Sequence, residues 1–339
     1  MKRFFIFSFL TALVVIGVGG FWGWQFAHHP LPLPNAAAPS PPPFEFTVEK
    51  GSSLKSLANK LAGAGLLSEP TGFWLLGRVM GQAKGIQAGT YRLDAPISPL
   101  ALLKKLNDGD VVTMDITFVE GITFRQIRES LEANAGLKIT LKGRSDQEVL
   151  RQVGATEKHP EGLFFPDTYR FSAGISDLEI LKNSYQKMQK RLVEAWDQRE
   201  QGLPYRSAYE ALIMASIIEK ETGRADERPL IGAVFINRLR IPMRLQTDPT
   251  VIYGMGLAFD GNIRKRDLTT DTPYNTYTRD GLPPTPIAMP GWGSLLAAVK
   301  PEKSDKLYFV ATKKGDGSHY FSRTLTEHNR AVAKYQLGR

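Results

Sequence analysis

An uncharged run near the start of the chain constrains its fold most. Lys2 and Arg3 precede 21 residues, 4–24, that carry no charged side chain. At about 1.5 Å per helical residue, such a run reaches roughly 30 Å, the thickness of a bilayer core. The sequence therefore predicts a cytoplasmic tail at 1–3, an uncleaved transmembrane anchor at 4–24, and the rest of the chain on the far side of the membrane. A cleaved signal peptide is the alternative, but its nearest small-residue site, 36–38, lies far downstream.

Composition narrows the classes of chemistry. The 339 residues include no cysteine, which excludes disulfides, thiolate catalysis and cysteine-ligated zinc. The net charge of +9 would suit an anionic polymer, but no basic block is interleaved with aromatics, so nucleic acid is not expected as a partner. The five histidines form no zinc-binding pair, and no phosphate loop or dinucleotide fingerprint occurs. Neither a metal nor a cofactor is expected.

A proline-rich segment at 25–44 follows the predicted anchor. Seven prolines fall between Pro30 and Pro43. Proline lacks the backbone donor that helices and sheets need and favours extended polyproline geometry. We expect a linker here, either a stalk that holds the globular part off the membrane or a passive connection.

A weak internal repeat predicts two small α+β subdomains, at 45–110 and 111–175. Each copy reads as a strand, a glycine turn, a hydroxyl N-cap and a short amphipathic helix. A returning strand at 89–93 completes the first copy, which resembles the LysM-type carbohydrate-binding module, a strand–helix–helix–strand unit. A generic α+β support domain is the alternative for this region.

The region 176–339 is predicted to be a mixed α+β domain, which makes the fold class α+β. Its hydrophobic pattern indicates two long helices and a late hairpin, at 178–196, 209–222, 307–311 and 319–321. Residues 240–290 are rich in Pro, Gly, Asp, Thr and Tyr. Loops of that length inside a compact domain are usually functional.

Glu219 is the candidate catalytic group. It follows the apolar run 211–218, which predicts a buried helix ending at a carboxyl. Desolvation at such a place favours the protonated form of a carboxyl, which a general acid needs. Helical spacing places Glu219 on the face of Ala215 and Ser216, whose small side chains leave room for a ligand, while Glu221 points to the opposite side as a structural partner for a basic group. The alternative is a charged helix end paired with Lys or Arg.

Polar side chains then gather in the loops that follow. Amides and hydroxyls can bond sugar substituents, and tyrosine faces can stack on pyranose rings. The candidates for substrate binding are Asn237, Gln246, Thr247, Asp248, Tyr253, Tyr274, Asn275 and Tyr277. For each of them, holding a loop in shape is the alternative role.

Several motifs together closely resemble the endolytic murein transglycosylase family, MltG or YceG-like. They are Glu-Lys-Glu-Thr at 219–222, the string 237–253, Tyr-Asn-Thr-Tyr at 274–277 with Gly-Leu-Pro-Pro at 281–284, His328-Asn329, and the run 161–169. Leu163 stands where a tryptophan is expected, which affects local packing. The resemblance covers nearly the whole chain.

The resemblance implies a bacterial inner-membrane protein whose catalytic domain lies in the periplasm. It implies cleavage of the β-1,4 bond between N-acetylmuramic acid and N-acetylglucosamine within nascent peptidoglycan strands, close to peptidoglycan synthases as partners. Glu219 would donate a proton, and the substrate's own C6 hydroxyl would attack C1 to give a 1,6-anhydro end. Asp248 is the plausible second carboxylate of a conventional hydrolase, which is one alternative. A glycan-binding tether with an inert Glu219 is the other.

Overall fold

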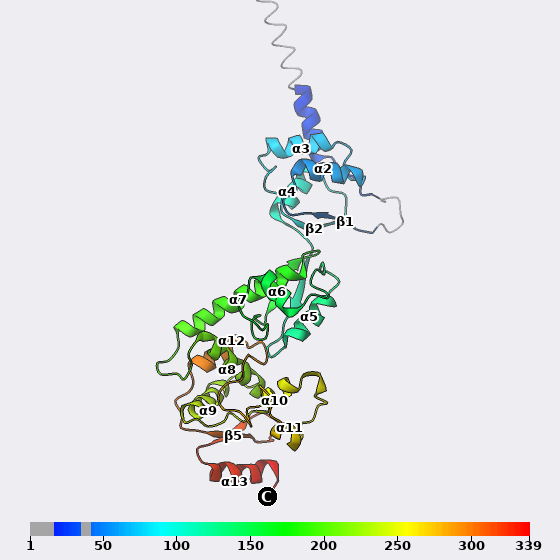
Figure 1. The fold of residues 1–339 in the computed structure, drawn as a ribbon. Coiled ribbons are helices and arrows are strands. Elements are labelled where there is room, and N and C mark those ends of the chain that lie inside the picture. The colour runs from blue at the N-terminus through cyan, green and yellow to red at the C-terminus, as the bar shows by residue number, and fades with distance from the viewer. Residues whose placement is uncertain (1–16, 35–41) are drawn as a thin grey trace, which may run out of the picture. The chain divides into compact units, whose positions relative to one another are not determined.

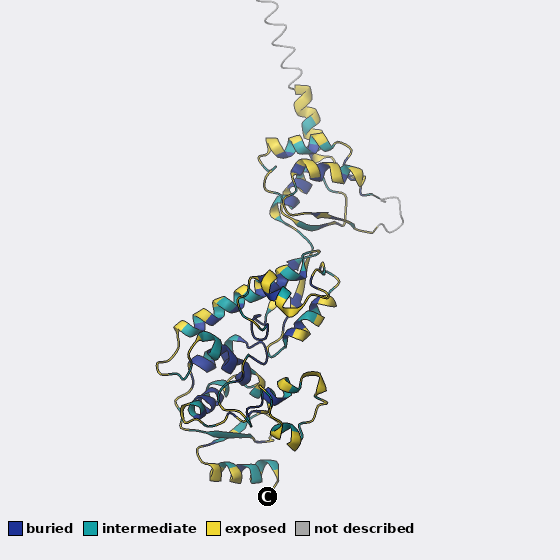
Figure 2. Ribbon diagram, viewed as in Figure 1, coloured by how far each residue is buried: buried dark blue, intermediate teal, exposed yellow. Residues whose placement is uncertain are grey.

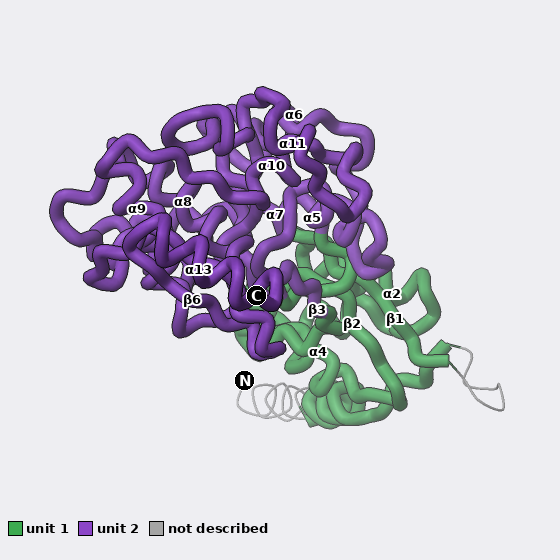
Figure 3. The backbone as a smooth tube through the Cα atoms, turned by 90° about the horizontal axis from the view of Figure 1, so that it is seen from below, with its two compact units in different colours: residues 1–114, 170–175 green, residues 115–169, 176–339 purple. Residues whose placement is uncertain are grey.

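The computed structural model describes residues 17–34 and 42–339. These residues form an α+β fold with three two-stranded sheets. The chain divides into two compact units, shown in Figures 1 and 3. Unit 1 comprises Met1–Met114 and Arg170–Ile175, and unit 2 comprises Asp115–Tyr169 and Ser176–Arg339. The region 111–175, expected to be a subdomain of its own, is therefore divided, and most of it belongs to unit 2.

Unit 1 has the predicted strand–helix–helix–strand order, followed by one more helix. Its elements are β1 (Phe44–Val48), α2 (Leu54–Gly63), α3 (Pro70–Val79), β2 (Gly89–Leu93) and α4 (Pro99–Asp108). Strands β1 and β2 pair antiparallel, with Phe44 opposite Leu93. As expected from the hydroxyl signals, the Ser53 side chain caps α2 by accepting a hydrogen bond from Ser56 N at 3.2 Å.

The segment expected to be a free linker packs partly into unit 1. Residues 17–28 are helical, and Leu31 N donates a hydrogen bond to Ile97 O at 2.9 Å. Leu31 and Leu33 are both buried in the core of this unit. They alternate with prolines, and an extended chain with that spacing can turn two leucines to one side. Residues 35–41 lie outside the described residues.

The predicted anchor lies mostly at residues 1–16, outside the described part of the chain. Among residues 17–34 and 42–339, no helix is both long and apolar enough to cross a bilayer. The helical residues 17–28 expose large apolar side chains, with Phe21 63% and Trp24 61% exposed.

Unit 2 is mainly helical around a buried pair, α8 and α9, seen in dark blue in Figure 2. Helix α8 contacts α7, α9, α10 and α12. The elements after β3 (Thr113–Thr117) are α5 (Phe124–Glu132), α6 (Asp146–Val153), β4 (Thr168–Ser172), α7 (Asp177–Asp197), α8 (Ala208–Glu221), α9 (Arg228–Arg240), α10 (Asp248–Met255), η1 (Gly256–Ala258), α11 (Lys265–Thr269), α12 (Trp292–Val299), β5 (Tyr308–Ala311), β6 (His319–Ser322) and α13 (Leu325–Gln336). The predicted long helices and late hairpin are confirmed, because α7 and α8 match within one residue and β5 pairs antiparallel with β6.

Candidate active site

Helix α8 carries Glu219 to the edge of the core of unit 2. Its first turn is capped by Ser207, whose side chain accepts a hydrogen bond from Glu210 N at 3.3 Å. Every residue from Ala211 to Ile218 is buried, because α8 is surrounded by neighbouring helices. The Glu219 side chain is 5% exposed. The carboxyl thus ends a buried helix, as the sequence predicts, but it is largely covered.

Two donors hold the Glu219 carboxyl. Gly291 N donates to Oε2 at 2.8 Å, and Arg228 Nη2 donates to Oε1 at 3.1 Å. The same Arg228 nitrogen lies 3.1 Å from Oε2 of Glu120. The helix pattern left two readings open for Glu219, a general acid at the edge of the core and a charged helix end paired with Lys or Arg, and the structure shows the ion pair of the second reading. Because α9 begins at Arg228, its first side chain faces the end of α8 and forms the ion pair that was the alternative.

The space beside the small side chains next to Glu219 is filled by another segment of the protein and is not open to a ligand. Ala215 and Ser216 are fully buried. Ser216 Oγ accepts a hydrogen bond from Ile287 N at 3.0 Å, so the segment 287–291 lies over this face of α8. The same segment supplies the Gly291 amide to Glu219. The expectation of ligand space on this face is therefore corrected.

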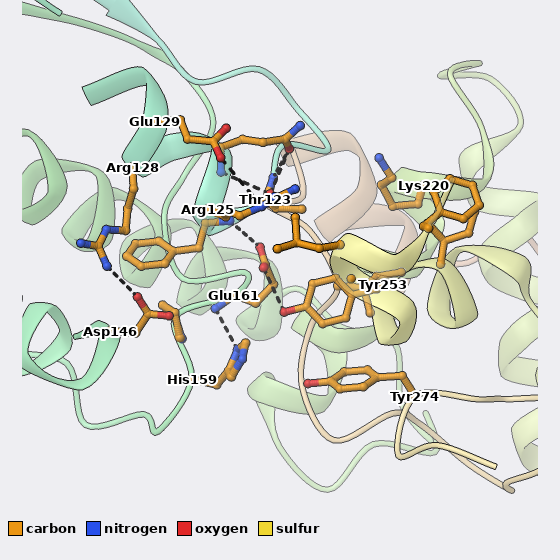
Figure 4. A pocket seen from close by; sticks show the side chains of 18 of the residues that line it. Thr123, Arg125, Arg128, Glu129, Asp146, His159, Glu161, Lys220, Tyr253 and Tyr274 are labelled. Atoms are coloured by element: carbon orange, nitrogen blue, oxygen red, sulfur yellow. Dashed lines mark hydrogen bonds and ion pairs between the residues drawn. The ribbon is translucent and has the colours of Figure 1, made fainter. Parts of the chain in front are cut away.

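Two neighbouring cavities in unit 2 lie next to this segment. The main cavity, about 1000 Å³, lies among α5, residues 159–161, α10 and Lys220 (Figure 4). The second cavity, about 650 Å³, lies between the loop 119–122 and α5. Gln126, Glu129 and Lys220 line both cavities. We call the two cavities together the groove.

Gly121 places Glu219 next to the groove. It lines the second cavity and has a φ of +77°, which favours glycine. A Cβ atom there would lie 3.8 Å from Cγ of Glu219 and 3.7 Å from Nζ of Lys220. Glu219 thus lies directly beside the second cavity, next to a residue that lines it.

Glu161 is a second buried carboxyl, at the main cavity. It is 3% exposed and accepts hydrogen bonds from Phe124 N at 2.9 Å and from the Tyr253 hydroxyl at 3.0 Å (Figure 4). Burial raises the pKa of Glu161 to about 7, although both hydrogen bonds oppose this shift. This side chain can therefore exchange a proton near neutral pH.

Two of the predicted sugar-binding residues, Tyr253 and Tyr274, meet at the main cavity. Their ring centroids lie 4.9 Å apart at an interplanar angle of 65°. Glu161 fixes the hydroxyl of Tyr253, and Thr285 Oγ1 lies 2.8 Å from that of Tyr274. The pair forms an aromatic side of the main cavity, of the kind on which a pyranose can stack.

A model of the YceG-like family matches residues 46–334, which is most of the chain. The chain belongs to the YceG-like family. The endolytic murein transglycosylase of Bacillus subtilis strain 168 is 35% identical over 305 residues, covering 85% of this chain and 83% of that protein. The endolytic murein transglycosylase of Streptococcus pneumoniae strain D39 is 29% identical over 98% of this chain, which spans 65% of the pneumococcal protein. The solved structure of a YceG-like protein from Listeria monocytogenes matches with a TM-score of 0.55 at 33% identity, covering 85% of this chain and 99% of that one.

In this YceG-like chain, three predicted binding residues, one on α9 and two in loops, bond the backbone of loops. Asn237 Nδ2 donates to Ser304 O at 2.8 Å, and the buried Asn275 donates through Nδ2 to Thr270 O at 2.7 Å. Gln246 has a φ of +49°, and its backbone N donates to Thr276 O at 3.2 Å. None of the three lines either cavity. Their contacts are those of residues that hold loops in shape, the alternative role.

The other three predicted residues gather around Glu221. The Thr247 hydroxyl donates to Glu221 Oε1, and the Tyr277 hydroxyl donates to Asp248 Oδ1 at 2.5 Å. Burial raises the pKa of Glu221 to about 7, with a further rise from the charge of Asp248. The partner expected for Glu221 was a basic group, whereas its direct partner is the hydroxyl of Thr247. Thr247, Asp248 and Tyr277 line neither cavity.

Sequence reasoning gave no role to Arg228, Glu120 or Glu161. Arg228 and Glu120 lie 9 and 99 residues from Glu219, so no local spacing connects them to it. Glu161 had a usable signal, because it directly precedes the apolar run Gly-Leu-Phe-Phe. Across residues 17–34 and 42–339, no three His, Asp or Glu side chains come together as a metal site would require.

Proposed function

We propose that this chain is an endolytic peptidoglycan lytic transglycosylase. It cleaves the β-1,4 bond between N-acetylmuramic acid and N-acetylglucosamine in nascent strands and leaves a 1,6-anhydro end. The observation that carries the proposal is the Glu219 carboxyl, held by two donors directly beside a sugar-sized groove. The names of the Bacillus and Streptococcus relatives support the same activity.

Glu219 acts first as the acid in this proposal. It protonates the glycosidic oxygen while C1 of the muramyl residue gains oxocarbenium character. The bond from Gly291 N fixes one carboxyl oxygen, so the other is directed to the substrate. For this step Arg228 must release Oε1, and Glu120 offers it a second partner at the same distance. When the strand enters, Arg228 thus yields Oε1 to the substrate and stays beside the Glu219 carboxyl through its contact with Glu120.

The carboxylate left by proton donation then acts as the base. It removes the proton of the muramyl C6 hydroxyl, and that oxygen attacks C1 within the same sugar. Because the nucleophile belongs to the substrate, its effective concentration is already high. The Arg228 guanidinium stabilises the carboxylate between the two steps.

The contacts of Asp248 favour this one-carboxyl mechanism. Glycosidases with two carboxyls place both of them at the scissile bond. Asp248, the plausible second carboxylate, bonds Tyr277 and lines neither cavity. Glu161 lines the main cavity, where its two oxygens join Phe124 N of α5 to the Tyr253 hydroxyl of α10.

Replacement of Glu219 tests the proposal. Glu219→Gln keeps the shape and the Gly291 hydrogen bond but removes the proton, so cleavage should fall about 10²–10⁴-fold. The matched control is Glu221→Gln two residues away, which should keep far more activity even if it lowers stability. Strand length after digestion and the melting temperature of each variant are the measurements. Unchanged cleavage by a folded Glu219→Gln protein would refute the proposal.

The proposed activity on peptidoglycan also suggests roles for the other parts of the chain. The uncharged run 4–24 would anchor the protein in the inner membrane with unit 2 in the periplasm, and the exposed Phe21, Trp22 and Trp24 suit a membrane interface. The strand–helix–helix–strand part of unit 1 would bind glycan as a LysM-like module. Anchoring would keep the enzyme near peptidoglycan synthases, where its cleavage would help to end strand elongation.

A further inference from the structure

One basic side chain stands where the two cavities meet. Lys220 lines both cavities, and Figure 4 shows it at the rim of the main one. Its Nζ donates a single long hydrogen bond, 3.3 Å, to Gly121 O. Within the part of the chain that the structure describes, this ammonium group forms no ion pair.

Most acids around the groove already have basic partners. Glu120 pairs with Arg228 at 3.1 Å, Glu129 with Arg125 at 4.0 Å, and Asp146 with Arg128 at 3.0 Å. Glu161 is buried below the main cavity and bonded to Phe124 N and the Tyr253 hydroxyl. The charge of Lys220 is therefore left at the mouth of the groove, where an anionic ligand could reach it.

The position of Lys220 in the chain relates this charge to the scissile bond. Lys220 follows Glu219 directly, so their Cα atoms are about 3.8 Å apart. On a helix, consecutive side chains diverge by about 100°, but Lys220 Nζ and Glu219 Cγ both lie within 4 Å of a Cβ placed on Gly121, so the two side chains lie beside the same residue of the second cavity. A sugar whose C1 is at Glu219 presents its C3 substituent one ring away, within reach of a lysine side chain.

The two sugars of peptidoglycan differ at that substituent. N-acetylmuramic acid carries a lactyl ether on O3, and N-acetylglucosamine carries a hydroxyl. The lactyl group ends in a free carboxylate on stripped strands, and on complete strands it carries a peptide that contributes carboxylates of its own. A cation near O3 therefore distinguishes the muramyl residue by charge.

We propose that Lys220 binds a carboxylate on the O3 substituent of the muramyl residue and so fixes which sugar lies on the C1 side of the cleaved bond. This inference rests on the proposed function. It adds a specificity-determining residue to the acid and gives the groove a preference for muramyl-containing strands over uncharged glycans.

Binding to the Glu219→Gln full-length protein in detergent tests the inference without cleavage. The probes are glycan strands with intact peptides, the same strands after amidase stripping, and the uncharged N-acetylglucosamine hexamer. Adding Lys220→Gln should weaken binding of at least one charged strand about tenfold and leave the hexamer unchanged. Lys220→Arg should keep most of the affinity, and Lys190→Gln, at an exposed α7 lysine that lines neither cavity, should change nothing.

Each outcome decides the point. If Lys220→Gln weakens the binding of stripped strands alone, Lys220 binds the lactyl carboxylate. If it weakens the binding of complete strands alone, Lys220 binds a carboxylate of the peptide. If Lys220→Gln weakens the binding of the hexamer equally, or weakens the binding of no probe, the inference is overturned, even if Glu219 is essential for cleavage. Failure of all probes to bind the Glu219→Gln protein would instead remove the proposed function on which the inference rests.

Discussion

At the residue scale, Arg228 joins two carboxylates at the proposed centre. One guanidinium nitrogen lies 3.1 Å from both Glu120 and Glu219, and the Arg228 side chain is 12% exposed. The two carboxylates differ in their exposure to solvent, because the Glu120 side chain is 47% exposed and that of Glu219 is 5% exposed. Water can replace Arg228 at Glu120 more easily than at Glu219. The arginine is therefore expected to matter most for the buried partner.

Arg228→Gln should lower kcat for strand cleavage about 10–100-fold. The change removes the cation that stabilises the Glu219 carboxylate between its acid and base steps. Arg228→Lys should recover part of the lost kcat. The lysine ammonium keeps the positive charge, but it lacks the planar guanidinium and cannot hold both carboxylates equally well. Arg323→Gln, at an exposed arginine paired with Asp305, is the matched control. Full kcat in the Arg228→Gln protein would show that the arginine has no part in the reaction.

The residue scale also shows what sequence alone could supply. The apolar run ending in a glutamate made Glu219 a candidate, and only the polar loops downstream and the family motifs singled it out as the acid. It could not supply Arg228 or Gly291, because these partners reach the carboxyl only after α9 and the segment before α12 have packed on α8. For the same reason, the sequence could not separate the tyrosines of the main cavity from asparagines that bond neighbouring loops.

At the element scale, Glu161 ties the start of α5 to α10. One oxygen accepts from Phe124 N at the first turn of α5, and the other accepts from Tyr253 on α10. A carboxyl at a helix N-terminus satisfies a backbone donor that would otherwise be unpaired. The two elements that form opposite sides of the main cavity are thus joined by one buried side chain.

This carboxyl should make the protein less stable as pH rises. Its pKa is about 7 in the folded chain against 4.5 for an ordinary glutamate, so folding holds the proton more tightly. Between these values the unfolded chain loses its proton first, and the free energy of unfolding falls from about pH 4.5 to about pH 7. The loss is on the order of 3 kcal/mol for Glu161.

Glu161→Gln removes this titration while keeping an acceptor for Phe124 N. Urea unfolding followed by tryptophan fluorescence should show a smaller fall in stability across this pH range than in the unsubstituted protein. Glu132→Gln, at an acid that also lines the main cavity but near its surface, should leave the slope unchanged. An identical slope in the Glu161→Gln protein would contradict the account.

At the scale of the whole molecule, the chain forms two units with separate cores. The core of unit 1 collects leucines from α2 and α4 around the fully buried Tyr91. That tyrosine donates its hydroxyl hydrogen to Gln87 O at 2.8 Å, and burial raises its pKa to about 12. The groove and Glu219 belong to unit 2.

Leu106→Ala should therefore destabilise unit 1 with little effect on α8. Leu106 is fully buried in the core of unit 1, and the cavity left by such a change costs about 2–5 kcal/mol. Hydrogen exchange of the full-length protein should become faster in α2 and α4 and stay unchanged in α8 and α9. An equal loss of protection in α8 would show that the two units unfold together.

The sequence predicted the architecture at this scale only in part. The repeat indicated the strand–helix–helix–strand order of unit 1, because turn glycines and hydroxyl caps are local signals. It did not indicate that 115–169 joins the helices after 176, since that depends on long-range packing. It also missed that Leu31 and Leu33 enter the core of unit 1, because prolines dominate the composition of that segment.

The mass of the newly formed glycan ends tests the central claim most directly, when strands are digested by the full-length protein in water enriched in ¹⁸O. If Glu219 serves as both acid and base and the muramyl C6 oxygen is the nucleophile, each new muramyl end will be lighter by one water than a reducing end and will contain no ¹⁸O. Reducing ends that carry ¹⁸O would show that water is the nucleophile and would contradict the account.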